Sequence, residues 1–90
     1  MTVEYHRAFQ KDVHRLEKSG WDMKPLSEFI ETLFGDQWPP DEKYEMHRLK
    51  GDLKGILDIH LRQNWIVFLQ KKNDRITLLR TGTHAMLGLG

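Results

Sequence analysis

Histidine is the residue type in this chain whose placement most strongly indicates chemistry. The 90 residues include five histidines, and three of them, His47, His60 and His84, stand where predicted loops meet predicted strands. Rigid strands can hold such residues at a fixed geometry. His6 and His14 fall in the predicted helical part, and we interpret them as surface residues. Three histidines within one half of a small chain favour a functional site.

Two kinds of chemistry use several histidines without cysteine. Zinc accepts three imidazoles and a water molecule, but His47, His60 and His84 include no short pair such as His-x-x-x-His, so we expect no metal and no cofactor. The alternative is proton transfer, because an imidazole with a pKa of ~6.5 can act as base or acid near neutrality. Metal-free RNA cleavage needs a base for the 2′-hydroxyl, an acid for the leaving 5′-oxygen and cations around the phosphorane.

The charge of the chain is divided unevenly between its two halves. Residues 1–46 hold six basic and ten acidic residues, a net charge of −4, whereas residues 47–90 hold eight basic and three acidic residues, a net charge of +5. This asymmetry favours a polyanionic partner for the C-terminal half. Part of it is equally explained as strand-edge protection against aggregation. The cations that could stabilise a phosphorane or contact flanking phosphates are Lys50, Lys54, Arg62 and Arg80.

The N-terminal third is predicted to form two helices that position the rest. Phe9, Val13 and Leu16 recur at i, i+4 and i+7, the stripe of an amphipathic helix that Gly20 ends. Asp12 and the other charged residues of this stretch are expected on other faces. The second helix is predicted to begin at Asp22 as N-cap, with Pro25 in its first turn. Its buried stripe comprises Leu26, Phe29, Ile30, Leu33 and Phe34, before Gly35.

The C-terminal half is predicted to form a sheet, reached through a loop over residues 36–45. Residues 56–61 alternate in polarity, which places Asp58 and His60 on the face opposite the core. Residues 65–70 and 76–80 form a hairpin around the turn 72–75, and a short strand over 3–5 joins the edge. The fold is therefore predicted as α+β: a two-helix hairpin on one face of a small, mostly antiparallel four-stranded sheet, with the second face open.

Composition restricts the class of protein further. The length predicts a single domain over 1–90, and the absence of cysteine excludes a disulfide framework, so a reducing cytoplasm fits best. The longest apolar runs are far shorter than the roughly 20 residues of a membrane span. Trp65, in the most apolar strand, permits two interpretations: a core residue, or a surface on which an unstacked base lies.

Four blocks in order, HRLKGDLKG at 47–55, DIH at 58–60, NWIV at 64–67 and LRTGTH at 79–84, resemble the YafQ branch of the RelE-type bacterial toxins. The resemblance implies a RelE-like fold and an endoribonuclease that cleaves mRNA on the ribosome without a metal. It also implies inhibition by a cognate antitoxin, DinJ-like, in a complex of higher order. The family's three catalytic histidines correspond to His47, His60 and His84, with Asn64, Trp65 and Arg80 in supporting positions.

The chain departs from the family pattern at a few positions. The acid before the tryptophan is Asn64 here, and the aromatic residue four positions after the last histidine is Gly88. Two further family aromatics are replaced by Leu53 and Ile56. A catalytically weakened homologue that mainly binds its antitoxin is therefore the alternative hypothesis, and a gyrase-directed relative on the same fold is a third.

Overall fold

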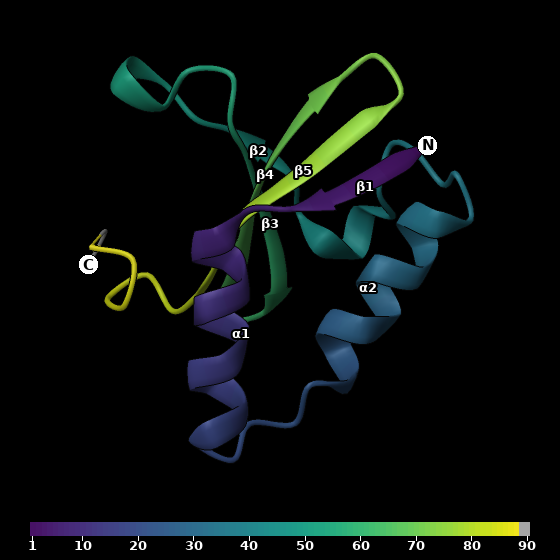
Figure 1. Cartoon of the computed structure of the whole chain (residues 1–90). Helices are drawn as coiled ribbons and strands as arrows, with labels where there is room; N and C mark the ends of the chain where they lie inside the picture. Colours follow the sequence, from purple (N-terminus) through teal and green to yellow (C-terminus); the bar gives the residue numbers. More distant parts are fainter. Residues whose placement is uncertain (89–90) are drawn as a thin grey trace.

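The computed structural model describes residues 1–88 and contains two helices and a five-stranded sheet (Figure 1). The chain begins with β1 (Thr2–Tyr5), which leads into α1 (Arg7–Lys18) and α2 (Lys24–Phe34). The strands β2 (His47–Arg48), β3 (Leu57–Arg62), β4 (Trp65–Lys72) and β5 (Arg75–Gly82) follow. Two 3-10 turns, η1 (Glu42–Tyr44) and η2 (Gly51–Leu53), lie in the connections before and after β2.

The helix boundaries follow from residues that satisfy the free backbone groups at the helix ends. At the start of α1, the Nδ1 atom of His6 accepts a hydrogen bond from the Ala8 backbone N–H at 3.0 Å. The helix ends at Lys18, and Gly20 then takes a φ of +82°, which reverses the chain. The predicted N-cap of α2 is wrong by one residue. Met23 occupies the cap, although Asp22 accepts a hydrogen bond from the Lys24 N–H at 3.0 Å.

The strand order is β1-β5-β4-β3-β2, so the predicted count of four strands is wrong. The additional strand is β2, whose two residues are too few to produce an alternating sequence pattern. The sheet is also mixed, because the predicted edge strand β1 runs parallel to β5, while the other pairs are antiparallel (Figure 1). The predicted turn between β4 and β5 is present, with Asn73 at a φ of +53°.

The main core lies between the helices and one face of the sheet, as predicted. Phe9 and Leu16 of α1 and Phe29 and Leu33 of α2 are buried there. They pack with alternate residues of three strands, namely Leu57, Ile59, Val67, Leu69, Ile76 and Leu78. This packing fixes the strands from one side, because each buried aliphatic side chain contributes on the order of 1.5–3 kcal/mol.

The second face of the sheet is not open as predicted. Ile66 and Phe68 point to this face, since their register partners are His60 and Asp58, yet they are only 0% and 6% exposed. The chain after β5 turns back next to them. Met86 lies against Gly82, the register partner of Ile66. The second face therefore has an apolar base beneath its polar side chains.

Within the described residues no helix is long and apolar enough to cross a membrane.

Candidate active site

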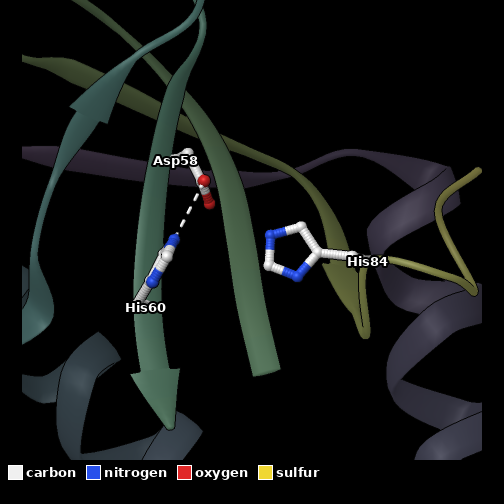
Figure 2. A group of neighbouring side chains, drawn as sticks. All are labelled: Asp58, His60 and His84. Atoms are coloured by element: carbon white, nitrogen blue, oxygen red, sulfur yellow. Dashed lines mark hydrogen bonds and ion pairs between the residues drawn. The ribbon is translucent and has the colours of Figure 1, made fainter. Parts of the chain in front are cut away.

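The fold brings the three predicted histidines together on the second face. The ring centroids of His47 and His60 are 5.3 Å apart, and those of His60 and His84 are 5.8 Å apart. His47 lies on β2 opposite Asp58, and His60 follows two residues later on the same side of β3. His84 comes from the segment after β5. Its ring points toward the pair Asp58 and His60 in Figure 2. Residues from three separate parts of the chain thus form one cluster.

Asp58 is the carboxylate of this cluster, and it lies on the face predicted from the sequence, where no role was expected for it. It is 7% exposed, and its Oδ2 lies 3.1 Å from Nε2 of His60. Its Oδ1 is buried and has no hydrogen-bond partner among residues 1–88. Glu45 is a second acid near the same ring, with Oε2 3.9 Å from Nδ1 of His60. A carboxylate beside an imidazole fixes its orientation, as proton transfer requires.

By register Arg80 lies beside Phe68, a residue of the second face, and its guanidinium extends to α1. Its Nε and Nη2 donate to the two carboxylate oxygens of Asp12, at 2.7 and 3.1 Å. Hydrogen bonding to Asp12 and the negative charge of this residue raise the pKa of Arg80 above its usual value, despite the opposing effect of partial burial. The guanidinium is therefore positively charged at every physiological pH, and its side chain is 40% exposed.

The predicted position of Asp12, away from the core face, is wrong. It is 5% exposed. Asp12 is three residues after Phe9 and four before Leu16, so helical geometry puts it on the same face as both. A charged residue at a core position of an amphipathic helix was the available signal. Such a residue is rarely buried without a partner.

Trp65 lies in the core, which does not support the expectation of base stacking. It is 4% exposed, and its indole N–H donates to the Thr81 hydroxyl at 2.9 Å. That hydroxyl donates in turn to the Ile66 carbonyl, also at 2.9 Å. The ring of Trp21 meets that of Trp65 edge-on at 5.1 Å. With 4% of its surface exposed, at the edge of a shallow hollow, Trp65 supports the start of β4 by packing.

The other predicted site residues lie at the periphery. Asn64 and Arg62 are exposed at the turn between β3 and β4, where they line a surface hollow with Trp21 and Thr83. Lys50 and Lys54 flank η2 and are exposed on the loop between β2 and β3, which projects beyond the sheet in Figure 1. These cations are therefore exposed and lie outside the histidine cluster itself.

The same cluster has the donor set of a transition-metal site. Asp58, His60 and His84 each offer one ligand atom, and these atoms all lie within 4.8 Å of one another. Nitrogen and carboxylate ligands suit zinc and copper. The expectation of no metal rests on the spacing of the histidines alone. Asp58 and His60, two residues apart on one side of a strand, also form a chelating pair.

A mixed sheet with two helices on one face and a histidine cluster on the other defines the class of small bacterial toxins that the sequence blocks resemble. Over residues 1–88 the chain matches the family described as the bacterial toxin of type II toxin-antitoxin systems, YafQ. The chain belongs to this family. A comparison with curated proteins returned no match.

Solved structures agree with this assignment. The chain is 32% identical to YafQ from E. coli, with a TM-score of 0.88 and coverage of 94% of both chains. It is 33% identical to the toxin in the E. coli DinJ-YafQ complex, with a TM-score of 0.85 and the same coverage. A metal-bound toxin from Helicobacter pylori is 35% identical, with a TM-score of 0.82 and coverage of 97% of this chain and 98% of that one.

Proposed function

We propose that this protein is a ribosome-dependent endoribonuclease that cleaves mRNA by acid and base catalysis, and that a cognate antitoxin inhibits it. The observation that carries the proposal is the contact of His47, His60 and His84 on one face. The ring centroid of His60 lies 5.3 Å from that of His47 and 5.8 Å from that of His84, so a phosphodiester bound beside His60 would have a second imidazole close by. One ring would accept the 2′-hydroxyl proton, and another would donate a proton to the departing 5′-oxygen.

The central ring in this mechanism is His60, which has a histidine neighbour on each side. Asp58 holds its Nε2 edge, so the ring keeps one orientation through the reaction. Arg80 would stabilise the additional negative charge of the phosphorane, since its guanidinium is charged and partly exposed. Because Trp65 is buried, ordering of the RNA would depend on the ribosome and on the peripheral cations.

Asp58 also bears on the alternative that the toxin is catalytically weakened. The family acid before the tryptophan is replaced here by Asn64, an exposed residue of the β3–β4 turn. A carboxylate nevertheless contacts a histidine of the cluster, because Asp58 lies 3.1 Å from His60. This contact favours an active nuclease over a protein that only binds antitoxin. Gly88, which replaces the family aromatic residue four positions after the last histidine, is exposed and takes a φ of +78°.

An antitoxin is proposed as the protein partner. The E. coli relative has been solved as a DinJ-YafQ complex at 33% identity to this chain. The net charge of +5 in residues 47–90 fits an acidic antitoxin segment, which would neutralise the same surface that binds RNA. Messenger RNA on ribosomes as substrate would place the protein in the cytoplasm.

The test is inducible expression of the wild type beside His84→Ala and the control His14→Ala, with mapping of transcript 5′ ends. His14 is an exposed histidine of α1, so its loss changes composition equally but leaves the cluster intact. We expect growth arrest and cuts within translated regions for the wild type and His14→Ala only. Folded wild-type protein that neither arrests growth nor cuts transcripts would favour the antitoxin-binding alternative. Efficient cleavage of naked RNA would contradict ribosome dependence.

Metal binding is a second candidate function of the same residues. The close ligand atoms of Asp58, His60 and His84 favour it, as does the metal-bound toxin from Helicobacter pylori among the relatives. Titration calorimetry with Zn²⁺ and Cu²⁺ would test it on the wild type and Asp58→Asn. We expect binding that Asp58→Asn weakens by about tenfold or more, and inhibition of RNA cleavage by bound metal. Equal heats for both proteins would exclude this site.

A further inference from the structure

A buried carboxylate on α1 makes three hydrogen bonds to the end of β5. Asp12 accepts from Nε and Nη2 of Arg80 and, at 3.0 Å, from the backbone N–H of Thr81. A further cation, Arg15, has its Nη2 at 3.9 Å from Oδ1 of Asp12. The two bonded residues lie 68 and 69 positions away in sequence, so this contact joins the N-terminal helix to the strand that leads to His84.

Capping of the strand edge explains only one of these three bonds. The edge strand β1 stops at Tyr5, opposite Leu78, whereas β5 continues to Gly82. The N–H of Thr81 therefore has no neighbouring strand on the β1 side, and Asp12 supplies its acceptor. A neutral acceptor would satisfy this N–H with a smaller desolvation penalty than a buried carboxylate. The negative charge is needed only for the two-bond contact with the guanidinium.

By register, the residue held in this way belongs to the same row of residues as the histidine face. Arg80 is the register partner of Phe68, which is in turn the register partner of Asp58. Arg80 and Asp58 thus lie in one row across three neighbouring strands. A guanidinium has five N–H groups, and Asp12 engages one on Nε and one on Nη2. Three N–H groups remain, in a plane that the two-bond contact fixes, and 40% of the side chain is exposed.

We propose that Asp12 is a positioning residue, which holds the Arg80 guanidinium in the orientation that receives a phosphate oxygen of the RNA at the histidine cluster. This inference rests on the proposed nuclease function. Without Asp12, Arg80 would retain its charge but sample several rotamers, and the loss would appear in the cleavage step more than in RNA binding. Asp12 would not touch the substrate, since it is buried beneath Arg80.

The test combines Asp12→Asn and Arg80→Ala with single-turnover cleavage of mRNA on programmed ribosomes. Asparagine keeps the shape and an acceptor for the Thr81 N–H but loses the charge. We expect Asp12→Asn to slow cleavage by about 10–100-fold while RNA affinity changes by less than about twofold. In the Arg80→Ala background the same substitution should have no further effect. Multiplicative effects of the two substitutions would overturn the proposal, because they would mean that Asp12 acts independently of Arg80.

Two further variants and one spectroscopic measurement keep the outcome decisive. Asp12→Glu retains the charge and should recover part of the rate, and Arg80→Lys should be as slow as Asp12→Asn because it cannot form two parallel bonds. Arg80→Lys also replaces Asp12→Asn if that variant fails to fold. The NMR signal of the Arg80 Nε–H should be protected from exchange in the wild type and lost in Asp12→Asn. If this signal stays protected in Asp12→Asn, Asp12 does not hold the guanidinium and the proposal is wrong, whether or not the wild type cleaves RNA. A wild type that cleaves no RNA would instead refute the nuclease function.

Discussion

The two faces of the sheet are built from the same strands but perform different tasks. Along β3, Ile59 points into the core between helices and sheet and is fully buried. Its neighbours Asp58 and His60 point to the other face, where they meet His47 and His84. Because adjacent residues of a strand differ so completely in surroundings, stability and activity should respond to separate substitutions. The strands that carry the histidine face are held by core residues on the opposite side of the sheet.

The histidine face also has an apolar layer of its own. Ile66 and Phe68 are buried beneath its polar groups, and Asp58 is 7% exposed on the same side. Water is excluded from this base, so the interaction between Asp58 and His60 is stronger than it would be on an open surface. Both faces therefore contain buried apolar residues, but only the histidine face also carries polar groups. The buried residues beneath these polar groups help to fix their orientation.

Replacement of His60 should have the largest effect on activity and little effect on stability. His60→Gln keeps a polar side chain on the histidine face but cannot transfer a proton near neutrality. We expect single-turnover cleavage on ribosomes to fall about 10²–10⁴-fold, with a change in the free energy of unfolding of less than about 1 kcal/mol. A variant that cleaves at the wild-type rate would remove His60 from the mechanism.

The adjacent substitution on the opposite face should give the converse result. Ile59→Ala removes fully buried methyl groups and leaves a cavity, so we expect a loss of about 2–5 kcal/mol in the free energy of unfolding, measured in urea. Ile59→Val is the control and should cost about 0.5–1.5 kcal/mol. The cleavage rate of the folded fraction should remain near that of the wild type. A large loss of rate in stable Ile59→Val would show that the two faces are coupled.

Much of the fold could be predicted because its signals are local. The stripe from Phe9 to Leu16 and the turn around Asn73 depend on residues a few positions apart, and both are present. The two residues of β2 and the parallel pairing of β1 with β5 depend on what lies beside them in the folded chain. The sequence pattern of such short segments does not indicate which strand will pair with them.

The histidines of the candidate site could be predicted from the sequence, whereas the roles of its two buried acids were missed. His47, His60 and His84 could be found because they stand near strand ends and match family blocks. Asp12 was misplaced because its charge outweighed its helical position between Phe9 and Leu16. The groups that satisfy the buried carboxylate, the Arg80 guanidinium and the Thr81 backbone N–H, lie far along the chain. Asp58 was seen on the correct face, yet its contact with His60 follows from the pleat of a single strand and was available from the sequence.

Trp65 tests the boundary between the two faces, because it is a family site residue that the structure places in the core. Trp65→Leu removes the indole N–H that donates to Thr81, and we expect a loss of about 1–3 kcal/mol in the free energy of unfolding. Affinity for ribosome-bound mRNA should change by less than about twofold. Base stacking would contribute about 1–3 kcal/mol to the binding free energy. A loss of binding free energy of that size in a stably folded variant would show that Trp65 contacts the RNA.

The smallest effect is expected at the loop between β2 and β3. Lys50 and Lys54 are exposed beside η2, away from both the core and the histidine cluster. If each contacts one phosphate, Lys50→Ala and Lys54→Ala should leave the cleavage rate at saturation and the unfolding midpoint unchanged. Each should weaken RNA binding slightly and reduce the slope of log affinity against log salt by about one. Lys72→Ala, at the end of β4, is the matched control and should leave this slope unchanged. Slopes equal to that of the wild type for Lys50→Ala and Lys54→Ala would mean that these two loop cations make no phosphate contact.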